Sequence, residues 1–214
     1  MNSKQILVES AKKIDIDLSP SMINSFMSYL ELIMIWGQKI NLTSVLKEQN
    51  IIIKHFIDSL TISSYIKDNS HILDIGTGAG FPGIPLLIQN NSLELSLMES
   101  TTKKVSFLKE VKRSLRLENL HIYNIRAENV IDELKNRFDY VIFRAVGDFE
   151  KIVKLARPYL KKNGKIIIMK GPKGVAEFKR YINKNPDIIE LIEIKEIELP
   201  ILKNKRILII LKYI

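Results

Sequence analysis

The stretch that decides the fold is HILDIGTGAGFPG, which spans residues 71–83. Its first five residues form a short, mainly apolar run of the kind found in buried strands, and glycines follow at positions 76, 78 and 80. Glycine lets a backbone turn sharply and approach a ligand closely, and a helix N-terminus, expected here near Pro82, favours a negative group. The stretch therefore predicts a strand, a glycine loop and a helix that together bind a nucleotide-like cofactor.

The glycine spacing distinguishes two classes of cofactor-binding protein. Dinucleotide-binding folds use the pattern G-x-G-x-x-G, whereas this loop has G-x-G-x-G and carries Phe81 where the first pattern needs glycine. Glu99, at the end of the next expected strand, is placed to hold the two hydroxyl groups of a ribose in either class. Phe81 and the lack of length for a substrate domain disfavour a nicotinamide-dependent oxidoreductase, which stays as an alternative.

Downstream of the loop, short apolar runs alternate with helix-like stretches. Five such runs, typical of a parallel sheet with crossover helices, occupy residues 71–75, 93–98, 120–125, 138–143 and 165–169. Two longer runs follow at 188–199 and 206–214, and the six residues between them are too few for a crossover helix. The sequence thus predicts an α/β fold with a seven-stranded sheet, made of five parallel strands and a C-terminal antiparallel hairpin.

The first part of the chain has a different character. Residues 1–69 contain no convincing strand, and their apolar residues recur at helical spacing. Ser19 followed by Pro20 is typical of a helix start, and the apolar positions continue toward Trp36. We therefore expect a helical segment over 1–69, packed on a cofactor-binding domain over 70–214.

The composition is that of an ordinary globular protein and excludes several classes of function. Hydrophobic residues make up 46% and charged residues 27% of the 214 residues, which excludes disorder as the overall state. The chain has no cysteine, which excludes disulfides, thiolate zinc sites and cysteine nucleophiles, and its three histidines lack the spacing of metal ligands. Because the N-terminus is charged and no apolar run reaches about 18 residues, we expect a soluble, cytoplasmic protein without a membrane span or metal.

Positive charge is concentrated in the second region. The net charge is +9, and residues 70–214 carry 26 basic and 17 acidic side chains, against 7 and 7 in residues 1–69. Two stretches are especially basic: 103–116 has six basic residues and one acidic, and 151–173 has eight and none. Such a surface favours an anionic partner such as nucleic acid, although a charged run is usually a solvated face.

Several short motifs outside the glycine loop resemble those of one enzyme family. They are Trp36, Asn41-Leu42-Thr43, His55-Phe56-Ile57-Asp58-Ser59-Leu60, Arg126-Ala127-Glu128, Arg144-Ala145 and Lys170-Gly171. Together with Phe-Pro-Gly-Ile-Pro at the end of the loop, they make the chain similar to the RsmG (GidB) family of bacterial ribosomal RNA methyltransferases. The resemblance implies a class I, Rossmann-like methyltransferase fold, S-adenosyl-L-methionine as cofactor, and N7-methylation of one guanine in 16S ribosomal RNA. The implied partner is ribosomal RNA or the small ribosomal subunit, and we expect a monomer.

The residues available for chemistry agree with methylation at a ring nitrogen. C5-methylation of a pyrimidine needs a cysteine nucleophile, and amino-group methylation typically uses an Asn/Asp-Pro-Pro-aromatic loop where this chain has Phe-Arg-Ala-Val-Gly. Guanine N7 has an in-plane lone pair and no proton, so positioning supplies most of the acceleration and no general base is required. Two alternatives stay open: ribose 2'-O-methylation, for which Lys170 could serve, and a noncatalytic RNA-binding module with the same fold.

The resemblance and the positions after the strands assign roles to the candidate residues. Asp74, Gly76, Gly78 and Gly80 are expected at the methionine end of the cofactor, Glu99 at its ribose, and Phe81, Ala127 and Glu128 around its adenine. Arg144 follows the fourth strand, is expected to meet the cofactor carboxylate or an RNA phosphate, and is the candidate catalytic residue. Arg126, Lys170 and Lys173 are expected to hold the RNA, more than helix 103–116 does. For His55 we expect a hydrogen-bonded structural role, because no proton needs to be abstracted.

Overall fold

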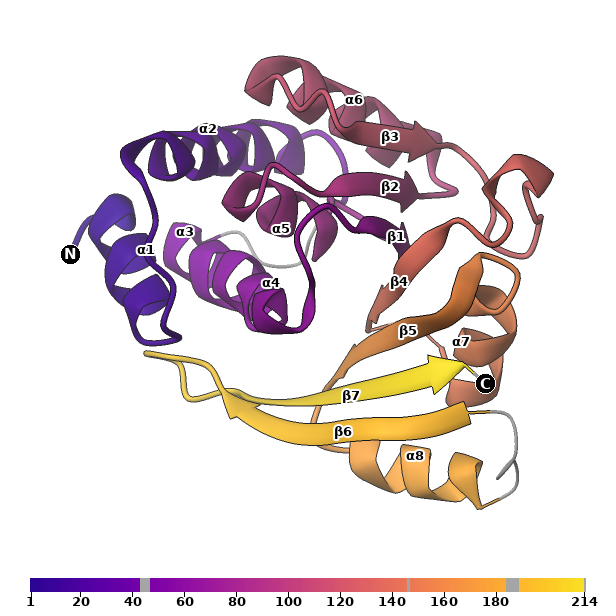
Figure 1. Cartoon of the computed structure of the whole chain (residues 1–214). Helices are drawn as coiled ribbons and strands as arrows, with labels where there is room; N and C mark the ends of the chain where they lie inside the picture. The colour runs from indigo at the N-terminus through magenta and orange to yellow at the C-terminus, as the bar shows by residue number, and fades with distance from the viewer. Residues whose placement is uncertain (43–46, 146, 184–188, 214) are drawn as a thin grey trace.

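Seven strands form one mixed sheet in the computed structural model, which describes residues 1–42, 47–145, 147–183 and 189–213 (Figure 1). The strands are β1 (His71–Ile75), β2 (Glu94–Met98), β3 (Leu120–Tyr123), β4 (Phe138–Arg144), β5 (Leu160–Lys170), β6 (Ile189–Glu198) and β7 (Lys205–Tyr213). Their order is β3-β2-β1-β4-β5-β7-β6; the first five are parallel, and β7 is antiparallel to both β5 and β6. The predicted parallel strands and C-terminal hairpin are confirmed. Thr43, Val146, Ile188 and Ile214, which belong to motifs or runs quoted above, lie outside the described residues.

Two strand boundaries differ from the expected ones by more than one residue, for local reasons. β5 begins at Leu160 rather than Lys165, because Leu160 pairs with Phe138 ahead of a register shift between β4 and β5. β3 ends at Tyr123, and the next side chain, Asn124, donates its amide to two carbonyls just after β2 instead of continuing the strand. Both changes lie at strand ends and leave the predicted topology intact.

Helices cover the sheet, and the N-terminal region is helical, as predicted. The α-helices are α1 (Ser3–Lys12), α2 (Pro20–Gly37), α3 (Glu48–Ile51), α4 (Asp58–Leu60), α5 (Gly83–Gln89), α6 (Thr102–Leu115), α7 (Phe149–Ala156) and α8 (Gly174–Ile182). The π-helix η1 (Ile52–Ile57) joins α3 to α4, and η2 (Ser63–Tyr65) and η3 (Asp132–Leu134) are short 3-10 helices. Helix α2 begins where predicted, because the Ser19 hydroxyl accepts a hydrogen bond from the Met22 amide and Pro20 fits the first turn. In the described part of the chain, no helix is both long and apolar enough to cross a membrane.

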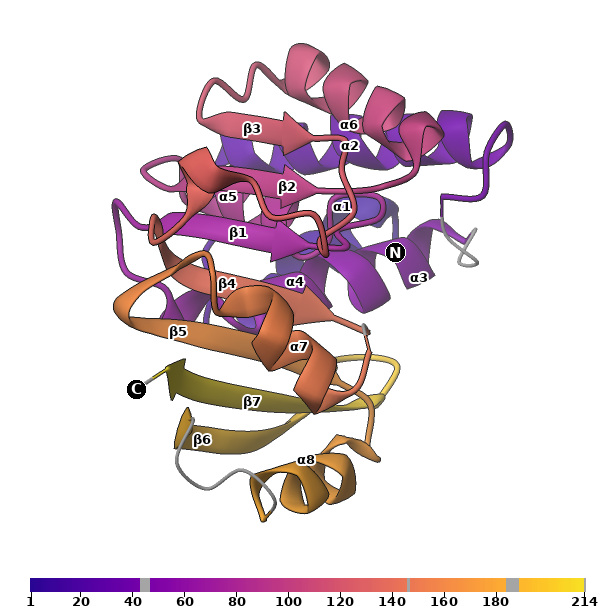
Figure 2. The ribbon, with the colours of Figure 1, turned by 90° about the vertical axis from the view of Figure 1, so that its right-hand side faces the viewer.

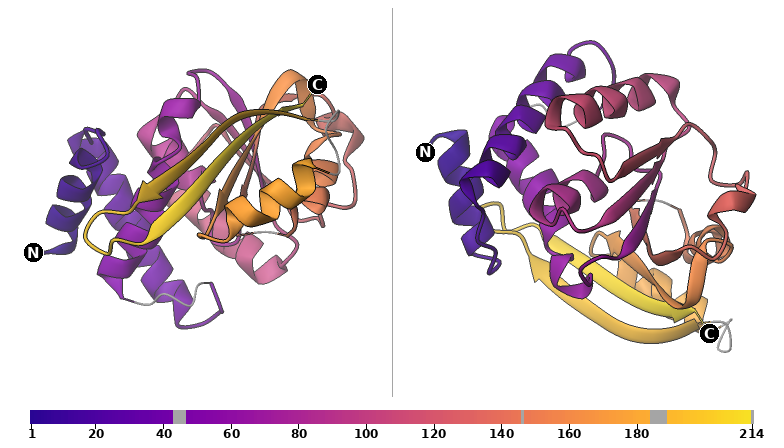
Figure 3. Two further views of the ribbon diagram at one scale, coloured as in Figure 1. Left: turned by 90° about the horizontal axis from the view of Figure 1, so that it is seen from below. Right: turned by 45° about the horizontal axis from the view of Figure 1, so that its top comes forward.

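Two hydrophobic cores lie on opposite faces of the sheet. One lies beneath α7 and α8, which Figure 2 shows in front of the sheet. The other lies beneath α2, α5 and α6 and combines Phe26 and Phe56 of the N-terminal region with Ile84 and Phe107. Figure 3 shows the turn between β6 and β7 beside the N-terminal helices, where Leu199 joins this second core. Residues 1–69 thus share a core with the helix that follows the glycine loop, while the domain boundary near residue 70 stays a prediction.

Candidate functional site

The glycine loop between β1 and α5 has the backbone conformation that its sequence requires. Gly76, Gly78 and Gly80 have φ angles of 71°, 64° and 93°, in the left-handed region that favours glycine. The Gly76 amide donates to the Met98 carbonyl at the end of β2, which ties the loop to the sheet. A Cβ atom on Gly78 would meet nothing within 4 Å, whereas one on Gly80 would lie 2.7 Å from the Tyr29 hydroxyl. The loop is therefore open at Gly78 and packed against the N-terminal helices at Gly80.

Asp74, the single acidic residue of β1, holds the glycine loop by hydrogen bonds from inside the protein. Its side chain is fully buried, and Oδ2 accepts hydrogen bonds from Thr77 Oγ1 at 2.8 Å and from the Gly83 amide at 2.9 Å. Oδ1 is buried without a hydrogen-bond partner among the described residues, and burial raises the pKa of the carboxyl group to about 6. Oδ1 is thus the carboxylate oxygen that the protein leaves without a partner in the described residues, and the contact of Asp74 with a cofactor stays a prediction.

Glu99 follows β2 and lies against the open side of the loop. Its side chain is 6% exposed; Oε2 accepts a hydrogen bond from the Gly78 amide at 3.0 Å, and Oε1 accepts one from the Thr101 amide at 2.8 Å. Two backbone donors fix the position of this carboxylate. The predicted ribose-binding residue is thus held next to the glycine that leaves space for a ligand.

A cleft opens in front of Glu99. A hollow of about 240 Å³ is lined by residues from the ends of β1, β2 and β3 and from α7, among them Gly76, Glu99, Arg126, Ala127, Glu128 and Lys151. A second hollow of about 690 Å³ shares Ala127, Glu128 and Lys151 with the first. Together the two hollows, which we call the glycine-loop cleft, have the size of sites for small molecules and cofactors. The structure therefore brings five of the predicted site residues into one cleft.

Lys151 and Leu155 belong to this cleft, although the sequence interpretation did not include them. They lie four residues apart on α7, and Lys151 forms an ion pair with Glu128 at 2.9 Å. This ion pair holds the pKa of Glu128 below its usual value. The four-residue spacing of Lys151 and Leu155 indicates that they share one face of a helix. No pattern in the nearby sequence indicates that this face reaches the loop after β3.

Phe81 does not line the cleft with Ala127 and Glu128, and its expected place beside the adenine stays a prediction. Its side chain is 4% exposed and its ring stacks on His55, with centroids 4.6 Å apart and an angle of 13° between the planes. The Tyr29 ring lies on the same side, with its centroid 5.6 Å from that of Phe81. A large aromatic ring directly after the loop gains more from burial among other rings than from exposure in a cleft. Phe81 therefore anchors the loop to the N-terminal helices.

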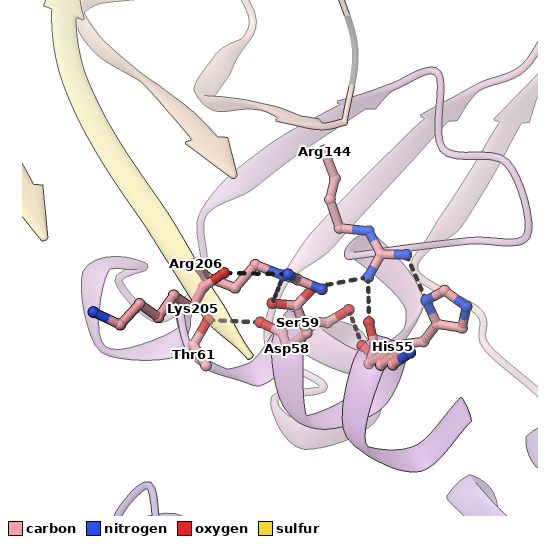
Figure 4. Close-up of polar contacts among 8 residues, drawn as sticks. His55, Asp58, Ser59, Thr61, Arg144, Lys205 and Arg206 are labelled. Atoms are coloured by element: carbon pink, nitrogen blue, oxygen red, sulfur yellow. Dashed lines mark hydrogen bonds and ion pairs between the residues drawn. The ribbon is translucent and has the colours of Figure 1, made fainter. Parts of the chain in front are cut away.

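Arg144, at the end of β4, points toward the N-terminal region (Figure 4). Its Nη1 donates to the Lys54 carbonyl at 3.2 Å and to Asp58 Oδ2 at 3.3 Å, and its Nη2 lies 2.7 Å from His55 Nδ1. Asp58 Oδ1 accepts a further hydrogen bond from Arg206 Nε at 3.1 Å. We call Arg144, Asp58, His55 and Arg206 the arginine–aspartate network. It joins β4 and β7 to the N-terminal region.

The arginine–aspartate network gives Arg144 and His55 structural roles. In this structure the Arg144 guanidinium contacts protein groups rather than the glycine-loop cleft, and it lies 5.1 Å from the centroid of the Phe81 ring. Arg144 therefore supports the loop in this structure, and its predicted contact with a cofactor carboxylate or a phosphate stays a prediction. Burial and the neighbouring arginines lower the pKa of His55 to about 3, so the ring is neutral and Nδ1 accepts from Arg144. This agrees with a structural role for His55.

Lys170 is held by contacts within the protein, and its predicted contact with RNA stays a prediction. Its Nζ donates to the Gly147 carbonyl at 2.8 Å and forms an ion pair with Glu177, and its side chain is 12% exposed. Arg126 and Lys173, in contrast, are exposed at the same edge of the sheet. Of the three residues predicted to hold RNA, these two are the ones free to meet a phosphate.

The basic stretch 151–173 does not form one continuous surface, because it passes from one end of the sheet to the other. Lys151 and Lys173 lie at the end that carries the glycine loop. Lys161 lies at the opposite end, where β5 begins, and forms an ion pair with Asp139 at 2.9 Å. Only part of this positive charge is therefore close to the cleft.

Comparisons with known proteins reveal relatives over nearly the whole chain. The family model for rRNA small subunit methyltransferase G matches residues 22–210. The protein named Ribosomal RNA small subunit methyltransferase G from Alkaliphilus metalliredigens (strain QYMF) is 35% identical over 209 residues, which cover 94% of this chain and 86% of the relative. The protein of the same name from Geotalea uraniireducens (strain Rf4) is 32% identical over 211 residues, which cover 98% of this chain and 96% of the relative.

Solved structures share the fold at low sequence identity. A SAM-dependent methyltransferase from Aquifex aeolicus matches with a TM-score of 0.60 at 16% identity, covering 77% of this chain and 93% of that chain. The M. jannaschii TYW2 structure, in complex with AdoMet, matches with a TM-score of 0.57 at 19% identity, covering 79% and 77%. These structures confirm the predicted methyltransferase-type α/β fold and no more than the fold. On its sequence, the chain belongs to the rRNA small subunit methyltransferase G family.

Proposed function

We propose that this protein transfers a methyl group from S-adenosyl-L-methionine to N7 of one guanine in 16S ribosomal RNA. The observation that supports this most is the buried carboxylate of Glu99, which lines the glycine-loop cleft and accepts a hydrogen bond from the amide of Gly78, where a Cβ atom would meet open space. Such a pair suits a nucleoside that approaches the backbone and offers two ribose hydroxyls. Family membership supplies the reaction class, a methyl transfer to small-subunit ribosomal RNA. We further propose that the protein acts as a monomer in the cytoplasm, on the RNA or the small subunit.

The glycine loop and the cleft in front of it fit S-adenosyl-L-methionine in four respects. The space at Gly78 admits a ligand close to the backbone, and Asp74 Oδ1 is a buried acceptor without a partner among the described residues. Glu99 contributes carboxylate oxygens, and Ala127 and Glu128 form the wall proposed for the adenine. When bound, the cofactor supplies an electrophilic methyl group on a positively charged sulfur.

The reaction at N7 needs little from the protein beyond placement of the base. N7 carries a lone pair and no proton, so a base held in line with the methyl group reacts without a proton acceptor. A ribose 2'-hydroxyl, in contrast, must lose a proton. Lys170, the residue that would serve that reaction, is already bound to the Gly147 carbonyl and to Glu177. A proton acceptor is thus required for the 2'-oxygen and not for N7.

The first prediction concerns the product. Small-subunit particles from cells that lack the protein, incubated with purified protein and labelled methyl donor, should yield 7-methylguanine. Its fixed positive charge makes the glycosidic bond labile, so borohydride and aniline treatment should cleave the RNA at that nucleotide. Sequencing the cleavage products locates the target. Label that survives aniline without strand scission would contradict N7-methylation and favour the 2'-oxygen.

The second prediction concerns the path of the RNA. Arg126 and Lys173 are exposed beside the cleft, so we expect their positive charges to meet RNA phosphates. Replacing both by alanine should weaken RNA binding and reduce its salt dependence by about two phosphate contacts. The control, Lys109→Ala with Arg116→Ala, removes two exposed charges from α6 and its C-terminus. RNA affinity is measured as a function of salt concentration for both double variants. A larger loss of affinity in the control would place the RNA over α6 rather than beside the cleft.

A further inference from the structure

A separate hollow of about 390 Å³ lies at the ends of β4 and β5. Gly147 lines it from the segment after β4, and Lys170, Lys173 and Glu177 line it from the end of β5 and from α8. Asp148, directly after Gly147, caps α7 and lines the glycine-loop cleft. The two sites therefore lie on either side of the start of α7, at one edge of the sheet. We call the second site the β5-edge hollow.

Lys170 and Glu177 form a fixed pair in the β5-edge hollow. Lys170 Nζ donates to the Gly147 carbonyl and to Glu177 Oε2, and it lies 4.9 Å from the centroid of the Phe149 ring. An ammonium group has three N–H donors, so one of them is left for a ligand. Glu177 is 41% exposed, and its Oε1 has no hydrogen-bond partner in the part of the chain that the structure describes. The pair thus offers the hollow one donor next to a carboxylate.

We propose that Lys170 and Glu177 bind the target guanine by its Watson–Crick edge. This inference rests on the proposed N7-methylation: Glu177 accepts hydrogen bonds from N1–H and from the N2 amino group, and Lys170 donates to O6. Guanine is the base whose Watson–Crick edge has two adjacent donors beside an acceptor, so a carboxylate beside an ammonium group matches it. Adenine would turn a ring-nitrogen lone pair toward the carboxylate, and this repulsion rejects it.

Binding through this edge leaves the reacting atom of the base accessible. N7 lies on the opposite edge of guanine from the N2 amino group, so contacts to Glu177 do not cover its lone pair. The same inference accounts for the buried contacts of Lys170. A group that distinguishes bases needs a fixed position, which the Gly147 carbonyl and the Phe149 ring provide, whereas a phosphate contact needs only charge.

The test combines a protein variant with the removal of one group from the RNA. Inosine lacks the N2 amino group of guanosine and keeps N1–H, O6 and N7. The substrates are two 16S RNAs, one with guanosine and one with inosine at the target position. Each RNA is used both free and assembled into small subunits, and kcat/KM is measured for every substrate. Wild type should prefer guanosine by about 10-fold or more, because a hydrogen bond to a charged acceptor is lost with inosine. In Glu177→Ala, activity on the guanosine RNA should fall, and the preference for guanosine over inosine should shrink to about 2-fold or less. The protein substitution and the inosine substitution both remove the contact between Glu177 and the N2 amino group.

Two further variants make the result decisive. Glu196→Ala breaks an exposed Lys–Glu pair elsewhere, with Lys205 at 2.7 Å on the β6–β7 hairpin, and should keep the wild-type preference for guanosine. Glu177→Gln preserves the size of the side chain and should also lose preference, which provides the test if the alanine variant does not fold. If wild type forms no 7-methylguanine on guanosine RNA, the proposed function fails. If it does, but wild type fails to discriminate or the Glu177 variants discriminate equally well, the guanine-binding role is overturned and the proposed function stands.

Discussion

The free energy of unfolding is expected to fall by about 3 to 5 kcal/mol when Asp58 is replaced by alanine. The Asp58 side chain is 3% exposed, and its carboxylate accepts hydrogen bonds from Arg144 at 3.3 Å and from Arg206 at 3.1 Å. Burial raises the pKa of Asp58, an effect that the two arginines oppose. Without the carboxylate, two partly buried guanidinium groups lose their anion, which costs far more than losing a surface ion pair. Denaturant unfolding of the variant and the wild type measures the difference.

Glu190→Ala is the matched control, because it removes the carboxylate of an exposed ion pair. Glu190 lies 3.0 Å from Lys212, and the two side chains are 51% and 32% exposed. Its loss should cost about 1 kcal/mol or less. Asp58→Asn keeps the shape of the side chain and one carbonyl acceptor, so its cost should lie between the two. If Asp58→Ala costs no more than the control, the arginine–aspartate network does not hold the N-terminal region to the sheet.

The network also matters for the glycine loop, which the N-terminal region supports from behind. The Tyr29 hydroxyl donates to the Ala79 carbonyl within the loop, and the His55 ring stacks on Phe81 directly after it. Arg144 in turn holds His55 by a hydrogen bond to Nδ1. The region 1–69 is therefore part of the structure that shapes the proposed cofactor site, which explains why its aromatic residues are buried against the loop.

The features that the sequence predicted depend on patterns within short stretches. Apolar runs separated by helix-like segments indicate parallel strands, and the six-residue connection at 200–205 indicates a hairpin. Glycine spacing indicates left-handed backbone at Gly76, Gly78 and Gly80, as the structure shows. Glu99 could be placed because the ends of neighbouring parallel strands meet at one edge of a sheet.

The features that the sequence could not predict depend on contacts between distant segments. Asp58 lies 86 residues before Arg144 and 148 residues before Arg206. The position of Arg144 after β4 indicates the correct edge of the sheet, but the direction of its guanidinium depends on a carboxylate that only the folded chain brings near. The surroundings of Phe81 depend on distant segments in the same way, because the aromatic rings that cover it come from α2 and η1.

The affinity for S-adenosyl-L-methionine is expected to fall by about 10-fold or more when Glu99 is replaced by alanine. The change removes the carboxylate proposed to hold the ribose hydroxyls, and each charge-assisted hydrogen bond contributes about 1.5 to 3 kcal/mol. It also removes the acceptor for the Gly78 amide, which shapes the open side of the loop. Isothermal titration calorimetry with wild type and variant measures the loss.

Two controls separate contact with the ribose from support of the loop. Glu94→Ala changes the opposite end of β2, where Glu94 lies 3.3 Å from His71, and should leave cofactor affinity unchanged. A cofactor analogue without the ribose 2'-hydroxyl should bind wild type more weakly, yet bind Glu99→Ala about as well as the complete cofactor does, because the contact is already missing. If Glu99→Ala binds the cofactor as wild type does, the ribose assignment is wrong. Tight binding of NAD by the wild type would instead favour the oxidoreductase alternative, because both cofactor classes place a ribose at this carboxylate.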